Sequence, residues 1–318
     1  EDKMKKIFTF LLIIGVVLMI MGCDGGGDEP TVRTPYQGGS EGLEVDFEYI
    51  SSLSNGMPTV YEDQGFPIEL KIQNKGEFEI PSNDIKFQVI GIANNLFSGL
   101  DTGEVSYGND LNEKTRDYDG GEAIISFGGN VEYIPELTKE FYVQTFTIEY
   151  EYPYETYATI PRVCYKYDVR DERICDMGGS QSLFVSGAPI QISSAVQERV
   201  GQGIFALSFD IVNAGGGQVT SDDYIATLNA ADRDTKDYHS VFGYVDYEIT
   251  PADDFVCRSI GPGEGIARLE NNRATVRCTL KNDVIADGAT PFTKPIDIKL
   301  NYKYRDYVDQ SVMVEKQI

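Results

Sequence analysis

The sequence has few of the residues on which most catalytic sites depend. Among 318 residues there is no tryptophan and a single histidine, His239, which lies in the polar segment 236–240. A single histidine excludes zinc sites with several histidine ligands. A catalytic triad would have to use His239, and no nucleophile elbow lies near it in the sequence. Carboxylates are so numerous that no pair stands out for glycoside hydrolysis. We therefore expect that the protein is not an enzyme.

Basic residues are also scarce. Lysine and arginine number 27 against 51 aspartates and glutamates, so the formal net charge is -24 and the isoelectric point is near 4.3. Nucleic acid and anionic lipid are attracted by basic patches, which makes both poor partners for this chain. An acidic surface of this kind favours solubility at a crowded cell surface.

The chain contains five cysteines, none of them in a Cys-x-x-Cys motif. If Cys23 is set aside, four remain, which fall into two local pairs: Cys164 with Cys175, and Cys257 with Cys278. Four cysteines allow three connectivities, and we favour the local one because each pair lies within one predicted hairpin or strand pair. Disulfides persist in exported proteins, so these cysteines predict an oxidising compartment.

The N-terminal segment has the pattern of an export signal. Lysines precede the uncharged apolar stretch 7–21, and Gly22 and Cys23 follow it. The segment 20–23 resembles the bacterial-type lipobox, although Met21 stands where that family prefers a small residue. The resemblance implies that Cys23 is lipidated and becomes the mature N-terminus. An uncleaved anchor helix and a pilin-like leader are the alternatives.

Beyond the leader, the sequence predicts an all-β protein. Residues 24–42 are rich in Gly, Pro and acids and predict a flexible linker. Residues 66–73 and 205–212 alternate apolar and polar side chains, which is typical of half-buried strands, and turn signals recur throughout. We expect two tandem Ig-like β-sandwich domains, at 43–187 and 188–318, after the signal or anchor segment 1–23.

The two predicted domains show signs of an internal duplication. Residues 68–76 align with 207–215 at an offset of 139 positions. Residues 163–168 resemble 300–305 at an offset of 137, but the segment 148–152 is an alternative partner for 300–304 at an offset of 152. The repeat register in the second half of each unit therefore stays open.

A strand followed by Asn-x-Gly, as at 74–76 and 213–215, resembles the CARDB-type Ig-like modules of archaeal and bacterial surface proteins. So does the pattern Cys-Tyr-x-Tyr…Ile-Cys at 164–175. The resemblance implies an Ig-like sandwich with an extracellular adhesive, spacing or scaffolding role. It implies no catalytic residue and no cofactor.

Two groups of residues are candidate sites. Asp117, Asp119 and Glu122 supply carboxylates beside a turn, which makes them weak candidates for calcium. Tyrosines at alternating positions share one face of a strand, where they either cover a sheet or form an aromatic interface. Because tryptophan is absent, such an interface favours protein over glycan. Its candidate residues are Tyr150, Tyr152, Tyr165, Tyr167, Tyr302 and Tyr304.

Together these observations predict a non-catalytic, membrane-anchored protein at the cell surface. It would be held by a lipid or a helix at its N-terminus and would act in adhesion, envelope scaffolding or partner binding. The alternative is a structural subunit of an extracellular filament or surface assembly, joined by strand addition. A solute-binding or hydrolytic lipoprotein is disfavoured because the sequence has no α/β pattern.

Overall fold

The computed structural model describes residues 35–54, 56–93, 95–168, 170, 174–228 and 241–317. The chain divides by its contacts into two compact units, Glu1–Pro35 and Tyr36–Ile318. The leader, Cys23, the first part of the predicted linker and His239 lie outside the described residues. Among the residues that are described, no helix is both long enough and apolar enough to cross a membrane.

Nearly all regular structure in the second unit is β-strand, because apolar and polar side chains alternate along the chain. In β4 (Phe66–Asn74) the side chains of Phe66, Ile68, Leu70 and Ile72 are buried, and the residues between them are more exposed. β13 (Ile204–Asn213) likewise buries its alternate apolar side chains. A period of two places one face of a strand against a core. The prediction of an all-β fold is confirmed.

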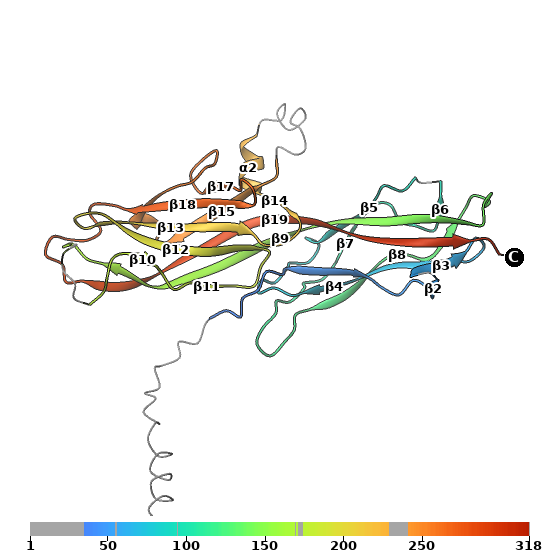
Figure 1. Cartoon of the computed structure of the whole chain (residues 1–318), viewed down its shortest axis with the longest axis horizontal. Helices are drawn as coiled ribbons and strands as arrows, with labels where there is room; N and C mark the ends of the chain where they lie inside the picture. Colours follow the sequence, from blue (N-terminus) through green and yellow to red (C-terminus); the bar gives the residue numbers. More distant parts are fainter. Residues whose placement is uncertain are drawn as a thin grey trace, which may run out of the picture. The chain divides into compact units, whose positions relative to one another are not determined.

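The described strands form two small sheets and one large sheet, shown in Figure 1. The first small sheet has the order β1 (Leu43–Phe47), β4, β8 (Glu122–Tyr133), β6 (Phe97–Ser98). The second small sheet has the order β10 (Gly179–Ser180), β12 (Ile190–Gly201), β13, β18 (Arg273–Leu280), β16 (Phe255–Arg258). Neighbouring strands in both are antiparallel.

The main path of the large sheet has the order β17 (Ile266–Arg268), β15 (Tyr244–Thr250), β19 (Phe292–Glu315), β9 (Phe141–Tyr165), β5 (Lys86–Ile90), β7 (Glu104–Ser106). Short strands extend it: β11 (Phe184–Val185), β14 (Gln218–Thr220), β3 (Met57–Tyr61) and β2 (Leu53–Ser54). The described helices are α2 (Asp222–Thr227) and the 3-10 turn η2 (Ala252–Asp254).

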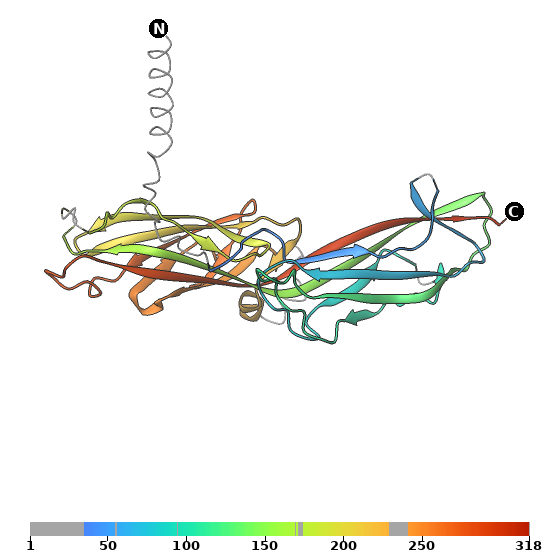
Figure 2. The ribbon, with the colours of Figure 1, turned by 90° about the horizontal axis from the view of Figure 1, so that it is seen from below.

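β9 and β19 pair antiparallel along almost their whole length, from Phe292 opposite Tyr165 to Glu315 opposite Phe141. Figures 1 and 2 show these two strands side by side through both groups of strands. The first small sheet packs on one end of the ladder, where the rings of Phe66 and Phe146 lie 6.1 Å apart. The second packs on the other end, where Phe205 and Tyr165 lie 5.1 Å apart. The result is a β-sandwich-like arrangement in which both small sheets share one large sheet.

The strand order of the large sheet is a palindrome about its two central strands. β17 corresponds to β7, β15 to β5 and β19 to β9, which is the order expected of a duplicated unit related by an approximate two-fold axis. Tyr154 lies opposite Tyr302, and Tyr152 lies opposite Tyr304. Between these pairs Pro153 lies opposite Lys303, so the axis passes close to this pair.

Side-chain contacts of the tyrosines fix the register of the repeat. The hydroxyl of Tyr154 donates to Asn74 Oδ1 over 3.3 Å, and that of Tyr304 donates to Asn213 Oδ1 over 3.4 Å. Asn213 follows Asn74 by 139 positions, as the sequence alignment predicts, but Tyr304 follows Tyr154 by 150. The predicted offsets of 137 and 152 for the second half of the repeat are therefore both wrong.

The last part of the predicted linker contacts the β body. The backbone N–H groups of Gln37 and Gly38 donate to the carboxylate of Glu77, each over 2.9 Å. Gly187 donates to the same carboxylate over 2.6 Å. Because β9 and β19 each contribute to both ends of the large sheet, neither predicted domain contains a complete half of it. The division into two Ig-like domains at residues 187 and 188 stays a prediction.

Candidate functional site

The paired strands β16 and β18 build the candidate site on the outer face of the second small sheet. Cys257 lies opposite Cys278, and Arg258 lies opposite Arg277. Side chains alternate between the two faces of a strand, so neighbouring residues point in opposite directions. Cys278 points inward and is fully buried, whereas both arginines are exposed on the outer face.

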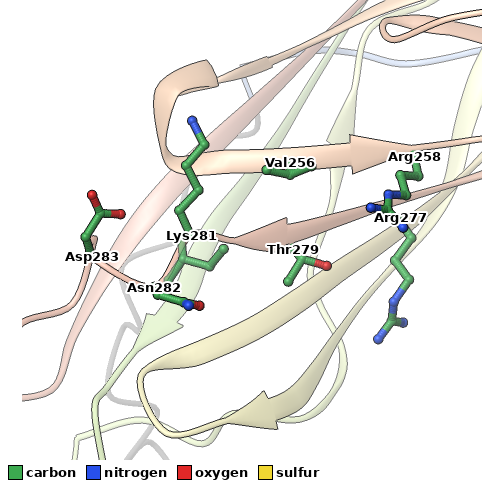
Figure 3. A pocket seen from close by; sticks show the side chains of 8 residues that line it. Val256, Arg258, Arg277, Thr279, Lys281, Asn282 and Asp283 are labelled. Atoms are coloured by element: carbon green, nitrogen blue, oxygen red, sulfur yellow. The ribbon is translucent and has the colours of Figure 1, made fainter.

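These exposed side chains line an open groove with a volume of about 680 Å³, shown from close by in Figure 3. Val256, which is 43% exposed, contributes apolar surface, and Thr279 contributes a hydroxyl. Leu280 also lines the groove, but its side chain is buried. Its remaining lining residues are Arg258, Arg277, Lys281, Asn282 and Asp283. A concave surface of this volume lies within the range of ligand sites, with cations, a hydroxyl and an amide available for binding.

The groove is positively charged on a chain that is otherwise strongly acidic. The guanidinium of Arg277 forms an ion pair with Glu198, and Lys281 Nζ donates to the backbone carbonyl of Asp253 over 2.6 Å. Within the described part of the chain, no ion pair or hydrogen bond engages the guanidinium of Arg258. Like charges directly opposite each other on paired strands are destabilising. An anion between Arg258 and Arg277 would remove that repulsion.

The chemistry available in the groove is recognition of anions. Arginine presents a planar fork of donors that binds a carboxylate with two parallel hydrogen bonds. We therefore interpret the groove as a binding surface for carboxylates.

Sequence reasoning missed this groove, although a signal for it was present. Arg258 directly follows Cys257, and Arg277 directly precedes Cys278. If the two cysteines lie opposite each other on antiparallel strands, the two arginines must also lie opposite each other. The predicted disulfide therefore implied two adjacent cations on the other face of the sheet.

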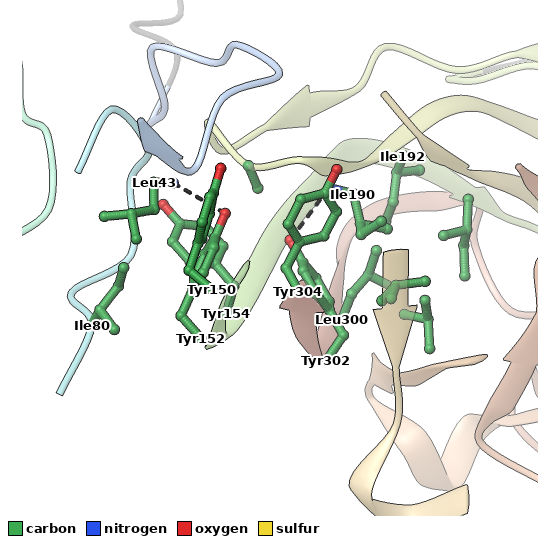
Figure 4. Close-up of a cluster of buried hydrophobic side chains, with 14 of the residues drawn as sticks. Leu43, Ile80, Tyr150, Tyr152, Tyr154, Ile190, Ile192, Leu300, Tyr302 and Tyr304 are labelled. Carbon is green, nitrogen blue, oxygen red and sulfur yellow. Dashed lines mark hydrogen bonds between the residues drawn. The ribbon is translucent and has the colours of Figure 1, made fainter. Parts of the chain in front are cut away.

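The tyrosines predicted as an interface lie elsewhere, and most of them are inside the protein. Tyr150, Tyr152, Tyr302 and Tyr304 pack together where β9 and β19 cross the repeat junction (Figure 4). Each of these four is at most 7% exposed, and Tyr165 is 1% exposed. Tyr167 is half-buried. Five of the six tyrosines therefore cover the inner face of the large sheet, as the first alternative predicts, and an interface at Tyr167 stays a prediction.

Burial also sets the acidity of these tyrosines. Removal from water disfavours the phenolate, so the pKa of Tyr302 and the pKa of Tyr152 are both well above the ordinary value. The pKa of Tyr304 is raised to about 12 for the same reason, although a hydrogen bond from the Gly217 N–H opposes the shift. These hydroxyls stay protonated at neutral pH and serve as hydrogen-bonding groups.

The structure does not bring the calcium candidates together. Asp117 and Asp119 are exposed near a turn, whereas Glu122 lies in β8 and forms an ion pair with Lys71 at 3.0 Å. In the part of the chain that the structure describes, no three acidic, histidine or cysteine side chains form a group suited to a metal ion. Calcium at this turn stays a weak prediction.

Both disulfides with local connectivity are present. Cys257 and Cys278 join β16 to β18, and their Cα atoms lie 3.9 Å apart. Cys164 is bonded to Cys175 with a Cα separation of 5.8 Å, but not across a hairpin. Cys164 belongs to β9, where its strand partner is Thr293, and Cys175 lies in the loop that follows β9. Two disulfides are consistent with an oxidising, extracellular environment.

Comparison of the chain with models of protein families, with curated proteins and with solved structures gives no match.

Proposed function

We propose that this chain is a non-catalytic, membrane-anchored surface protein that binds a partner rich in carboxylates. Export and lipidation at Cys23 follow from the lipobox-like segment 20–23. The two disulfides of the β body support export. The anchor would hold the body at the membrane surface, where two acyl chains on one cysteine give stable attachment.

The observation that carries the binding role is the opposition of Arg258 and Arg277 in the open groove. Like charges side by side on paired strands are destabilising, and Glu198 pairs with Arg277 but not with Arg258. A carboxylate-bearing segment would relieve the repulsion, and the exposed side chain of Val256 would cover its side-chain carbons. A chain with a net charge of -24 repels acidic partners elsewhere, so binding would be confined to this groove.

Titration of the full chain with a ten-residue glutamate peptide at low salt tests this role. Arg258→Ala should weaken binding at least about tenfold, because a charge-assisted hydrogen bond contributes roughly 1.5–3 kcal/mol. Arg273→Ala is the matched control. It changes the net charge equally and lies on the same face of β18, but it removes a guanidinium that is paired with Asp210. Equal weakening by both variants, or no binding at low salt, contradicts the proposal.

A second candidate function is assembly by strand addition. β8 pairs with β4 along residues 122–131, whereas β6 covers its other side only at residues 132–133. The described residues therefore provide no strand partner beside residues 123–126, and Ile124 in this stretch is 60% exposed. An uncovered edge with an exposed apolar side chain is a template for pairing with another chain.

Light scattering over a range of protein concentrations tests the assembly role. The full chain should form larger species as its concentration rises, and Ile124→Lys should prevent this because a charge on an edge strand opposes pairing. Ile134→Lys is the control, since Ile134 is also exposed but lies beyond the end of β8. A chain that stays monomeric throughout excludes strand addition.

A further inference from the structure

A separate cavity of about 170 Å³ lies at the repeat junction and shares no lining residue with the cationic groove on β16 and β18. It is open to solvent between the start of β1, the tyrosines of β9 and β19, and the glycine turn at 215–216. Gly215 lines the cavity, and a Cβ atom there would clash with Tyr304 Oη at 2.1 Å.

Aromatic rings form one side of the cavity. Tyr150 and Tyr152 are stacked with ring centroids 6.3 Å apart, and Tyr304 lies 5.9 Å from Tyr152. The hydroxyls of Tyr152 and Tyr304 each accept a hydrogen bond from a backbone N–H, which fixes the two rings. Figure 4 shows the tyrosines gathered between the segment of Leu43 and that of Ile190. Only small parts of these side chains are accessible, since Tyr150 is 7% exposed, Tyr304 3% and Tyr152 1%. Aromatic rings attract cations.

A carboxylate without a counter-ion completes the lining. Asp306 is half-buried, and its Oδ1 accepts a hydrogen bond from the backbone N–H of Tyr307 over 2.9 Å. No lysine, arginine or histidine among the described residues forms an ion pair with it. Burial raises the pKa of Asp306, and the charge of Asp306 in turn raises the pKa of Tyr150 beyond the effect of burial. Glu41 and Glu44 also line the cavity, and Glu44 forms an ion pair with Lys75 at 3.5 Å. The cavity thus has an excess of negative charge beside three tyrosines.

The second copy of the repeat shows what this position looks like without a cavity. At the offset of 150, Tyr150 corresponds to Leu300 and Asp306 corresponds to Thr156. Thr156 is fully buried, and its hydroxyl donates to the carbonyl of Ile190 over 2.6 Å. It also lies 3.0 Å from the hydroxyl of Tyr302. Only one side of the approximate two-fold axis therefore has the extra ring and the carboxylate.

We propose that this cavity binds an organic ammonium ion with a methylated head group. At roughly 30 Å³ per water-sized group, the volume has room for about five heavy atoms, the number in tetramethylammonium. The rings would contact the methyl groups, and Asp306 would balance the charge. Glu41 and Glu44 line the cavity as well, but among the described residues no three acidic, histidine or cysteine side chains form the group of oxygen ligands that a calcium ion requires. This site is independent of the carboxylate-binding groove.

The proposal is tested by calorimetric titration of the full chain with tetramethylammonium chloride. A titration with sodium chloride at equal ionic strength is the control for non-specific ion effects. Saturable binding is expected for tetramethylammonium alone. Asp306→Asn should weaken it at least tenfold, and Tyr150→Leu, which copies the other repeat, should weaken it similarly. Asp309→Asn is the matched control, because it makes the same change at an exposed position of β19.

Failure to detect saturable binding, or unchanged affinity in Asp306→Asn, would overturn the proposal. Near-UV circular dichroism of each variant checks that the tyrosine cluster is intact. If Asp306→Asn is misfolded, Tyr150→Leu provides a second test of the site. A parallel titration with methylammonium, which has the head group of a lysine side chain, separates the two sources of an ammonium group. Tighter binding of methylammonium would refute the methylated head group.

Discussion

The two asparagines that end β4 and β13 make different numbers of contacts, so their replacement should have different effects on stability. Asn74 is fully buried. Its Nδ2 donates to the carbonyls of Phe78 over 2.7 Å and Leu111 over 3.1 Å. Its Oδ1 accepts from the N–H of Gly76 over 3.2 Å and from the hydroxyl of Tyr154 over 3.3 Å. All four hydrogen-bonding positions of the amide are thus occupied.

Asn213 occupies the equivalent place in the second repeat but is only half-buried. It donates to the carbonyl of Gly217 over 2.9 Å and accepts from Tyr304 over 3.4 Å. A hydrogen bond contributes about 1 kcal/mol net, and more when its loss leaves a buried group without a partner. Asn74→Ala should therefore lower the free energy of unfolding by about 4 kcal/mol, and Asn213→Ala by about 1.5 kcal/mol.

Equilibrium urea unfolding with the disulfides intact measures both values, with near-UV circular dichroism of the tyrosines as the signal. A double-mutant cycle of Asn74→Ala with Tyr154→Phe should show coupling of about 0.5–3 kcal/mol, because the two side chains are hydrogen-bonded. If Asn213→Ala destabilises the protein as much as Asn74→Ala, or if neither costs more than about 1 kcal/mol, the assigned role of the amides is wrong.

Three further changes test the electrostatics and packing of the body. Burial raises the pKa of Asp246 to about 6, so between about pH 4 and pH 6 the folded state binds more protons than the unfolded state, and the free energy of unfolding should fall as pH rises. Asp246→Asn still accepts a hydrogen bond from the Ser221 hydroxyl but cannot titrate. Urea unfolding of this variant at several pH values should therefore show a flatter pH dependence. Tyr247→Phe should raise the free energy of unfolding by about 1 kcal/mol, because the buried hydroxyl has no hydrogen-bond partner among the described residues. Replacing Cys257 and Cys278 with serine should lower the melting temperature, since opening the bond across 21 positions costs about 3 kcal/mol.

The parts of the fold that were predictable are those that depend on local alternation. β4 and β13 follow from apolar residues at every second position, and their equivalence follows from the shared Asn-x-Gly ending. The burial of the tyrosines had a signal that was misjudged. Glu149, Glu151 and Glu155 occupy the intervening positions of β9, so the tyrosine face is the one left for the core.

The long ladder of β9 and β19 was not predictable from spacing, because strand pairing is a non-local choice. Nothing within either strand states that residues 141–165 and 292–315 lie side by side. The same is true of the cavity beside Asp306, which arises only where two repeats meet. The repeat register was misread for a related reason. Tyrosines occupy so many alternate positions that several alignments of the two repeats satisfy the same pattern. The hydrogen bonds of Tyr154 to Asn74 and of Tyr304 to Asn213 distinguish these alignments.

The proposed surface-display role depends most directly on export and anchoring through Cys23, which intact-mass analysis of the membrane-extracted protein measures. A mature chain that begins at Cys23 and has the added mass of acyl chains is the predicted result. A chain that retains residues 7–21 and has no lipid would contradict it.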